Sequence, residues 1–248
     1  MFRSVAVALF ILLTVGSCAQ AETIRLATLE WPPYIGQELE QQGYVAEIIR
    51  TAFARSDIEV DLTFMPWKRT VEETRVGRFQ GYVPEYFSQE LRKDFVFSIP
   101  VPGGPLVLLA RRGSGISYST LKDLTPYRIG IVKGYVNTRE FDAASYLNKQ
   151  PFVDDLTNLR MLLRKRVDLV TMDLLVGLYL ARKHLGGTRD IEALQPALEH
   201  KLLYLCFPKS RDDHLRLLVA FNSGITAMMA DGTLAVIQDR HGFVQSEW

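Results

Sequence analysis

The 248-residue chain contains little cysteine, little histidine and no excess of charge of one sign. Two cysteines cannot form a dense disulfide framework or a four-cysteine zinc site, and the four histidines lack the spacing of metal ligands. Lys and Arg together number 29, and Asp and Glu together number 28. Because a dedicated nucleic-acid-binding protein concentrates positive charge, this balance argues against a nucleic-acid partner.

The motifs of the common catalytic and nucleotide-binding sites are also missing. The sequence has no phosphate-binding loop, no glycine-rich dinucleotide fingerprint, no Gly-x-Ser-x-Gly and no His-Glu-x-x-His. Its 48% hydrophobic and 23% charged residues are ordinary for a globular protein of one large or two small domains. We therefore expect no metal and no cofactor, and the sequence favours a non-enzymatic role.

The N-terminus has the features of an export signal. Arg3 supplies a positive charge, Val5 to Val15 form an apolar run of 11 residues, and Ala19-Gln20-Ala21 provides the small residues of a cleavage site. The apolar run is shorter than a membrane span requires. We expect residues 1–21 to be a signal peptide, and the mature chain from Glu22 to be a soluble periplasmic protein.

A lipoprotein is the alternative interpretation, because Val15-Gly16-Ser17-Cys18 loosely resembles a lipid-attachment site. In that case the chain stays anchored to the membrane at Cys18. After cleavage at Ala21, by contrast, Cys206 is the single cysteine of the mature chain. It lies in an apolar run from Leu202 to Phe207 that is typical of a buried strand, so we expect a buried and unreactive thiol.

Hydrophobic patterns predict strands and helices that alternate in two similar halves, separated by Gly113-Ser114-Gly115. The predicted strands cover residues 23–28, 58–64, 81–83, 95–97, 106–110, 128–132, 152–153, 167–172 and 202–207. The predicted helices cover residues 45–53, 66–78, 174–185, 212–229 and 233–240, and two more begin at caps formed by Asn137 with Glu140 and by Asp155. We expect an α/β protein of two lobes with its ligand site on loops between them.

Several short segments carry a further signal when they are taken in chain order. They are Trp31-Pro32-Pro33-Tyr34, Gly43-Tyr44, Pro66-Trp67-Lys68-Arg69, Gly81-Tyr82-Val83-Pro84-Glu85-Tyr86, Phe97-Ser98-Ile99-Pro100, Ile129-Gly130-Ile131-Val132-Lys133-Gly134-Tyr135, Arg166-Val167-Asp168, Asp173 and Asp231-Gly232-Thr233. Together, from Glu22 to about Gly242, they resemble the family 3 extracellular solute-binding proteins, the periplasmic components of polar amino-acid uptake systems.

The resemblance implies a two-lobed periplasmic-binding-protein fold (class II), with two mixed sheets flanked by helices and a two-strand hinge. Lobe 1 would comprise residues 22–110 and 205–248, and lobe 2 residues 111–204. The crossing strands would have their hinge near Arg111 and near Pro208. A monomer would close on a small-molecule ligand and deliver it to a membrane permease or a sensor.

The sequence departs from the family where members hold the carboxylate of an amino acid. Members place an Arg before the Phe-Ser-x-Pro strand, and the matching residue here is Leu91, with Arg92 one residue later. Because an Arg–carboxylate contact depends strongly on geometry, its loss disfavours an ordinary α-amino acid as the ligand. Asp173 does match the family acid that meets the ligand ammonium group.

The candidate ligand-binding residues are Trp31, Tyr34, Trp67, Arg69, Glu85, Tyr86, Asn137 and Asp173. Aromatic rings and acids on loops can hold a cation, whereas Arg69, or Asn137 near a helix N-terminus, can meet an anion. Each candidate also has a purely structural explanation. Trp31 can fill the core, Arg69 can pair with a surface carboxylate, Glu85 and Tyr86 can lie on a solvated loop, and Asn137 and Asp173 can be helix caps.

Three functions are compatible with this pattern. The favoured one is a binding protein that captures a small polar solute for an ABC-type transporter. An enzyme on the same fold is the second, since cyclohexadienyl dehydratase resembles this family, and Glu85 or Asp173 would then be the acid or base. A ligand-sensing module without a transport role is the third, and the eroded carboxylate motif favours it. The fold alone does not choose among them.

We predict that the exported protein begins at Glu22, because the cleavage site Ala19-Gln20-Ala21 follows the apolar run. Mass spectrometry of the mature N-terminus, with protein from the soluble periplasmic fraction, measures this directly. A diacylglyceryl group on Cys18 would contradict the prediction and show a membrane-anchored protein instead.

Overall fold

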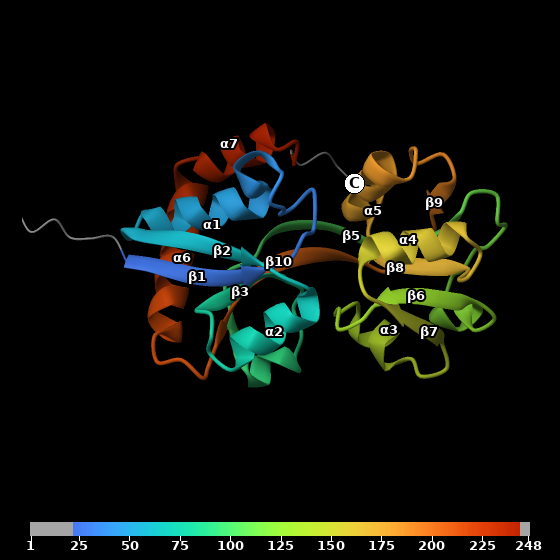
Figure 1. The fold of residues 1–248 in the computed structure, drawn as a ribbon, viewed down its shortest axis with the longest axis horizontal. Helices are drawn as coiled ribbons and strands as arrows, with labels where there is room; N and C mark the ends of the chain where they lie inside the picture. The colour runs from blue at the N-terminus through green and yellow to red at the C-terminus, as the bar shows by residue number, and fades with distance from the viewer. Residues whose placement is uncertain (1–21, 244–248) are drawn as a thin grey trace, which may run out of the picture.

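The computed structural model describes residues 22–243, so the predicted signal peptide, residues 1–21 with Cys18, lies outside the described residues. Figure 1 shows two lobes side by side, joined by two long strands. Among the described residues no single helix has both the length and the hydropathy to cross a membrane. The consecutive helices α6 (His214–Ala230) and α7 (Thr233–Arg240), bent by 84°, meet both measures only when they are taken together.

The first lobe is a mixed sheet flanked by helices. Besides α6 and α7 it contains β1 (Glu22–Thr28), α1 (Tyr44–Ala54), β2 (Ile58–Phe64), α2 (Trp67–Arg75), β3 (Gly81–Glu85) and β4 (Phe95–Phe97), with short 3-10 helices η1 (Glu40–Gln42) and η2 (Leu91–Lys93). Strand β1 lies between β2 and β3 and is parallel to both. The apolar face predicted for α1 is buried, and α2 ends before residue 78 because Gly77 adopts a φ of 81°.

The second lobe also alternates strands and helices, around a set of strands of its own. It contains η3 (Leu121–Leu124), β6 (Arg128–Val132), α3 (Arg139–Ala143), β7 (Asn148–Phe152), α4 (Asp155–Leu163), β8 (Leu169–Asp173), α5 (Leu174–His184) and β9 (Ile191–Ala193). Strand β6 lies between β7 and β8 and is parallel to both. Strand β7 covers the segment before residue 152, whereas the sequence predicts a strand at 152–153. All of β8 is buried, and α5 follows it without a connecting loop.

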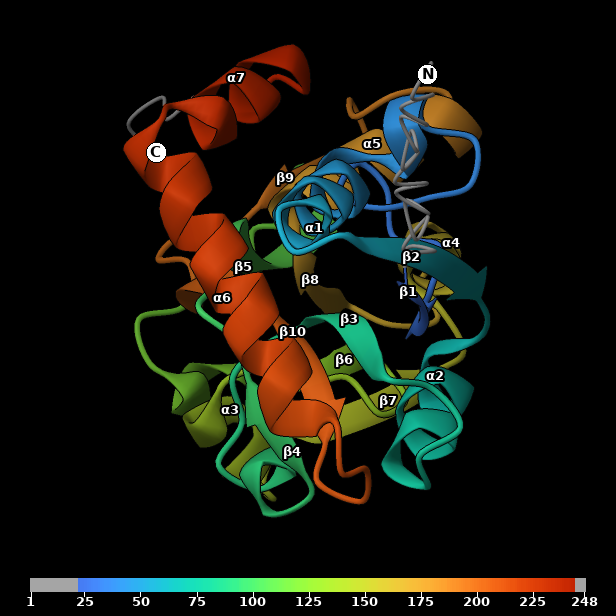
Figure 2. The same ribbon diagram turned by 90° about the vertical axis from the view of Figure 1, so that its left-hand side faces the viewer.

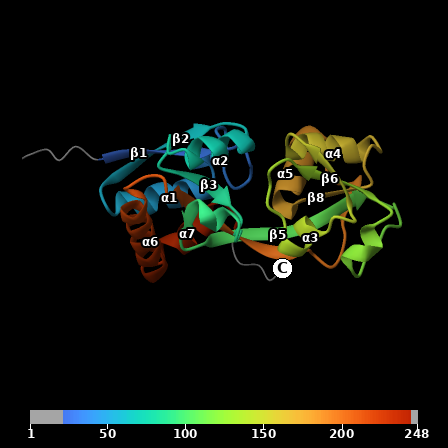
Figure 3. The ribbon, with the colours of Figure 1, turned by 90° about the horizontal axis from the view of Figure 1, so that it is seen from below.

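Two strands cross between the lobes, β5 (Val101–Arg111) and β10 (Glu199–Pro208) (Figure 3). They pair with each other from Val101 with Leu203 to Leu106 with Glu199. Beyond this crossing, β5 pairs with β8 and β9 of the second lobe, whereas β10 pairs with β3 and β4 of the first. Hydrogen bonding is therefore continuous through both lobes, and the crossing lies several residues before the hinge expected at Arg111 and Pro208.

Two of the predicted helix caps are wrong by one residue. Thr138, not Asn137, caps α3, since its side chain accepts the N–H three residues later at 3.0 Å. Asp154, not Asp155, caps α4 in the same way at 2.7 Å. These shifts release both side chains for other contacts, that of Asn137 inside the second lobe and that of Asp155 beside a cavity between the lobes.

The strand predicted around Cys206 is confirmed as part of β10. The side chain of Cys206 is fully buried and makes no disulfide. Burial raises the pKa of its thiol well above the usual range, so the thiolate form is strongly disfavoured.

Helix α6 crosses α1 at close range (Figure 2). Gly224 makes this distance possible, because a Cβ at that position would lie 2.2 Å from the carbonyl oxygen of Ala52 in α1. On either side of the contact Phe221 and Ile225 are buried, and the ring of Phe221 lies 5.5 Å from that of Phe53. Helix α6 therefore covers the core of the first lobe.

We predict that Gly224→Ala destabilises the protein, although alanine favours a helix by about 1 kcal/mol over glycine. The added methyl group must push α6 away from the backbone of α1, at an expected net cost of about 1–3 kcal/mol in the free energy of unfolding. Urea unfolding measures the change. The matched control is Ser223→Ala, an exposed position on the same helix, which we expect to be neutral within about 0.5 kcal/mol. Equal stability of the two variants would contradict the close packing.

Candidate ligand site between the lobes

An aromatic cluster begins on the loop after β1. The rings of Trp31 and Tyr34 stack with centroids 4.8 Å apart, and the ring of Tyr86 meets Trp31 edge to face at 5.9 Å. The N–H groups of Tyr34 and Ile35 both donate to the carbonyl of Trp31, which holds the loop in a tight turn. Because the three rings are at most 7% exposed, they are fixed parts of the structure rather than a solvated loop.

The carboxyl group of Asp173 lies where the two lobes meet. The Tyr34 hydroxyl of the first lobe lies 3.2 and 3.1 Å from its two oxygens, and the Tyr86 hydroxyl donates to Oδ2 at 3.4 Å. From its own lobe Asp173 accepts the N–H groups of Leu175 and Val176, at 2.9 and 3.3 Å, and so caps α5. From the sequence, a helix cap and a place in the ligand site are alternative roles for Asp173. In the structure Asp173 both caps α5 and lies between the lobes.

The backbone of the crossing strand β5 passes directly beside this contact. A Cβ on Gly104 would lie 2.4 Å from the Tyr34 hydroxyl oxygen and 2.9 Å from Oδ2 of Asp173. A residue with a side chain at this position would therefore separate the hydroxyl from the carboxyl group.

A second buried carboxyl group is that of Glu85, at the end of β3. It is 4% exposed and accepts the Tyr82 hydroxyl at 3.0 Å and the backbone N–H of Tyr86 at 2.8 Å. Lys201, on the crossing strand β10, is 5% exposed. Its Nζ lies 2.8 Å from Oε2 of Glu199 and 5.3 Å from the ring centroid of Tyr86. Lys201 thus brings a buried positive charge to the same region.

A third buried carboxyl group belongs to Asp155, the first residue of α4. It is 5% exposed, its Oδ2 accepts the Tyr135 hydroxyl at 3.0 Å, and its Oδ1 has no hydrogen-bond partner. The Tyr135 ring meets Trp67 of the first lobe edge to face at 5.9 Å. Trp67 also donates its Nε1–H to the carbonyl of Gly134 at 3.2 Å. These residues form a second set of contacts between the lobes.

Two adjoining cavities follow these side chains. The inner cavity has a volume of about 20 Å³, room for one water-sized group, and its walls are almost wholly apolar, with Glu85 among the lining residues. The outer cavity, of about 910 Å³, has the size of a small-molecule site and lies between the segments 29–39 and 64–67 of the first lobe and helices α4 and α5 of the second. Trp67 and Tyr135 line both cavities, and Asp155 lines the outer one.

Burial raises the pKa of all three carboxyl groups. The pKa of Glu85 rises from its ordinary 4.5 to about 8, although its hydrogen bonds and the charge of Lys201 act against the shift. Burial raises the pKa of Asp173 from 3.8 to about 7, against the opposing effect of its four donors. It raises that of Asp155 to about 7 as well, and the nearby charge of Asp173 adds to this shift. A positive charge from outside would stabilise all three ionised forms.

Four predicted site residues line neither cavity: Tyr34 and Asp173, which contact each other where the lobes meet, and Arg69 and Asn137, which lie elsewhere. Arg69 lies on the outer face of α2, where its side chain is 67% exposed and lies 3.9 Å from Glu73. Asn137 is buried inside the second lobe, where it donates to Asp142 and accepts from the Thr171 hydroxyl, both at 2.9 Å. The structure does bring together the candidates other than Arg69 and Asn137, namely Trp31, Tyr34, Trp67, Glu85, Tyr86 and Asp173.

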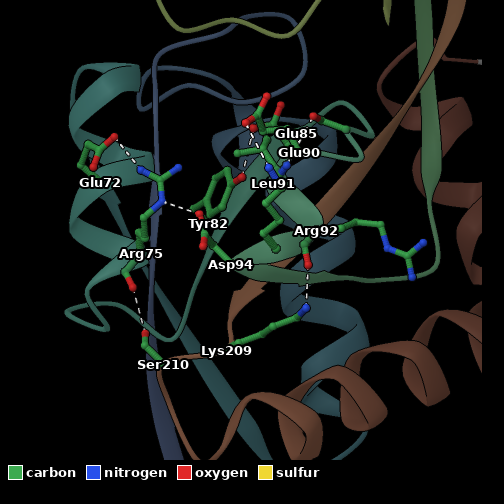
Figure 4. Close-up of polar contacts among 12 residues, drawn as sticks. Glu72, Arg75, Tyr82, Glu85, Glu90, Leu91, Arg92, Asp94, Lys209 and Ser210 are labelled. Carbon is green, nitrogen blue, oxygen red and sulfur yellow. Dashed lines mark hydrogen bonds and ion pairs between the residues drawn. The ribbon is translucent and has the colours of Figure 1, made fainter.

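Figure 4 shows the position at which the resemblance implies a carboxylate-binding arginine. Leu91 and Arg92 lie on η2, and the Arg92 side chain is exposed, with its guanidinium 5.9 Å from the ring centroid of Phe87. In the figure this side chain points away from Tyr82 and Glu85. Within residues 22–243 no arginine lines either cavity. Arg92 therefore does not replace the missing contact from the neighbouring position.

A family model built from the bacterial extracellular solute-binding proteins, family 3, matches residues 24–244. This chain belongs to that family. Among curated proteins, it is 24% identical over 216 residues to the L-cystine-binding protein TcyJ of Escherichia coli strain K12, which covers 85% of this chain and 78% of the relative.

Solved structures share the two-lobed fold at lower identity. A histidine kinase sensor domain with similarity to periplasmic binding proteins is 17% identical, with a TM-score of 0.79 over 89% of this chain and 96% of that one. The arginine-bound form of truncated ArgBP from T. maritima is 16% identical, with a TM-score of 0.70 over 83% and 96% of the two chains. At these identities the likeness shows the fold, and it confirms the fold class expected from the sequence.

Sequence reasoning missed several residues of this site, namely Tyr82, Tyr135, Asp155 and Lys201. Tyr82 and Tyr135 lie in segments that carried the family resemblance. However, the alternation of apolar and polar residues in a strand does not distinguish a residue that lines a cavity from one that is buried in the core. Asp155 was explained as a helix cap. Lys201 begins the apolar run of β10, and a lysine in such a run is a signal of a paired buried charge.

We predict that Glu85 makes the protein less stable as the pH rises. Its folded pKa of about 8 exceeds the ordinary 4.5, so the stability from its bound proton is complete below pH 4.5 and is lost as the pH rises through about 8. The slope reaches at most about 1.4 kcal/mol per pH unit. Glu85→Gln keeps an acceptor for Tyr82 and should flatten the loss of unfolding free energy over this interval, as measured by urea unfolding at a series of pH values.

The control for this experiment is Glu90→Gln, which removes the same charge from the same lobe at a side chain that is 84% exposed. We expect this control to keep the pH dependence of the wild type. If Glu85→Gln kept it too, the buried carboxyl group would not be the source of the titration.

Proposed function

We propose that the protein is a periplasmic solute-binding protein that captures a small polar or amino-acid-like solute between its lobes and delivers it to an ABC-type transporter. After export it acts as a monomer that closes about its two crossing strands. The observation that carries the proposal is the set of buried carboxyl groups and aromatic rings beside a cavity of about 910 Å³ between the lobes. Membership of a solute-binding family supports capture rather than chemistry.

A cationic group is the ligand feature that these residues suit best. Glu85, Asp155 and Asp173 are negative when ionised, and among the described residues Lys201 is the one buried cation. The rings around them, Trp31, Tyr34, Trp67, Tyr86 and Tyr135, can face a cation with their negative surfaces. L-cystine, named for the relative from E. coli, and arginine, bound by the T. maritima protein, both carry cationic groups. An amino acid without a further cationic group fits less well, because no arginine of residues 22–243 lines either cavity to meet its carboxylate.

Two alternatives each have one observation in their favour. A sensor that passes ligand binding to a partner is supported by the similar fold of a histidine kinase sensor domain. An enzyme is supported by the carboxyl groups of Asp155 and Asp173, whose pKa values of about 7 suit a general acid or base near neutral pH. Deletion of the gene for this protein, with uptake of the solute as the readout, would separate transport from sensing.

The first experiment is a thermal-shift screen of the mature chain against amino acids, amines, organic acids and sugars. A ligand at 100 times its dissociation constant should stabilise the folded protein by about 2.7 kcal/mol. Analysis of the same mixtures for turnover decides between binding protein and enzyme. A mature chain that no compound of the panel stabilises would contradict the binding function.

We predict that Trp67→Ala and Asp173→Asn both weaken the ligand that this screen identifies. Loss of one cation–π contact costs about 0.5–2 kcal/mol, and loss of a hydrogen-bonded buried charge costs about 1.5–3 kcal/mol. Isothermal titration calorimetry measures both dissociation constants. Arg69→Ala is the matched control, because this exposed side chain lies on the same helix as Trp67 without reaching the cavities. Unchanged affinity in both site variants would refute the assignment of the site.

A further inference from the structure

The end of helix α7 turns sharply and directs Phe243 back toward helix α1. Gly242 adopts a φ of 71°, and its N–H donates to the carbonyl of Asp239 at 3.0 Å. The N–H of Phe243 donates to the carbonyl of Gln238 at 2.8 Å. These two bonds form a Schellman motif, which ends a helix in a defined direction. The ring of Phe243 then stacks on Tyr44 of α1, with the two centroids 4.3 Å apart.

A carboxylate on α1 holds the same turn. Glu47 accepts from the guanidinium of Arg240, and Nε2 of His241 lies 2.7 Å from its Oε2. The side chains of Glu47 and His241 are only 12% and 10% exposed. Polar contacts at this degree of burial are screened less by solvent than those of exposed pairs. The residues before Phe243 are therefore anchored to α1 by polar contacts as well as by packing.

Tyr34 links this turn to the contact between the lobes. Its ring is fully buried and has two close aromatic neighbours, Trp31 at 4.8 Å and Phe243 at 5.1 Å between centroids. Trp31 belongs to the same loop as Tyr34, whereas Phe243 comes from the end of α7. Because a close-packed interior leaves a ring little room to shift, the two neighbours together set the position of the Tyr34 hydroxyl.

The contact of this hydroxyl with Asp173 tolerates little displacement. Its distances of 3.2 and 3.1 Å to the two carboxyl oxygens lie at the long end of the range for a hydroxyl hydrogen bond. Truncation of Phe243 would leave space beside the Tyr34 ring, and a small shift into that space would carry the hydroxyl out of range. Phe243 itself lines neither cavity, so it can act on the site only through its neighbours.

We propose that Phe243 is a positioning residue: held at the end of α7, it keeps the Tyr34 ring where the hydroxyl reaches Asp173 of the second lobe, and it thereby favours the closed arrangement of the lobes. This inference rests on the proposed function, in which closure accompanies capture, and it adds a residue that sets how readily the lobes close. Since the contact joins two parts of the protein itself, it can be measured without a solute.

Pulsed electron paramagnetic resonance of the mature chain measures the separation of the lobes. Spin labels are attached at Arg69→Cys on α2 and Glu140→Cys on α3, two exposed positions outside the site, one in each lobe. Cys206 is fully buried, so it takes up no label. Phe243→Ala should lower the ratio of closed to open molecules about two- to tenfold, the effect of one hydrogen bond. Phe243→Leu, which keeps an apolar side chain, should give a smaller loss in the same direction.

A second substitution separates positioning from packing. Tyr34→Phe deletes the hydroxyl and keeps the ring, so it should lower the closed fraction by a similar factor. In this background Phe243→Ala should have no further effect, because the contact through which it acts is already lost. Val236→Ala is the matched control on α7, since this side chain is 58% exposed, and it should leave the closed fraction unchanged.

An unchanged closed fraction in Phe243→Ala would overturn the inference. So would an equal loss in the Tyr34→Phe background, or a labelled protein with Phe243 intact that shows no closed fraction. The thermal-shift screen tests the binding function separately. A solute found there, while Phe243→Ala leaves the lobes unaffected, keeps the binding function and removes the role of Phe243. If no solute is found and closure is lost as expected, that role stands and the binding function fails.

Discussion

The contact between the Tyr34 hydroxyl and the Asp173 carboxyl group is the interaction on which the site between the lobes depends. It joins a loop of the first lobe to the junction of β8 and α5 in the second, at distances of 3.2 and 3.1 Å. The junction fixes Asp173, because the residue ends a buried strand and caps the next helix at once. Tyr34 is fixed by its stacking on Trp31. With both ends held, this contact fixes the first lobe against the second beside the crossing strand β5.

This arrangement concentrates negative groups where water is largely excluded. Burial makes ionisation of Glu85, Asp155 and Asp173 unfavourable, and the surrounding hydroxyl and N–H donors recover only part of that cost. A site of this kind is less stable than an apolar interface of the same size, and in the proposed function this cost is the counterpart of selectivity for a cation. Protein stability and solute selectivity therefore act in opposite directions at these residues.

Most of the fold could be predicted from the sequence. The spacing of apolar residues indicates each strand and helix, and the order of the segments that resemble the family indicates how they are arranged. Strands such as β6 and helices such as α1 follow from patterns within a few residues. The site could be predicted only in part. Whether Arg69 points to a cavity or to Glu73 depends on which face of α2 the sheet covers. Whether Asp155 caps a helix depends on a shift of one residue, which composition does not resolve.

Gly104 has a consequence for how affinity can evolve in this protein. Its missing side chain lets the Tyr34 hydroxyl and the Asp173 carboxyl group approach each other, since a Cβ there would lie 2.4 Å from the hydroxyl oxygen. In the proposed function, in which the lobes close on the solute, a bulkier residue would hold the two lobes apart and lower the population of the closed conformation. The apparent dissociation constant is the intrinsic one divided by the competent fraction, so a substitution that opens the lobes weakens every solute by the same factor. Position 104 can therefore set the concentration range of the response, while the cavity walls set its chemical selectivity.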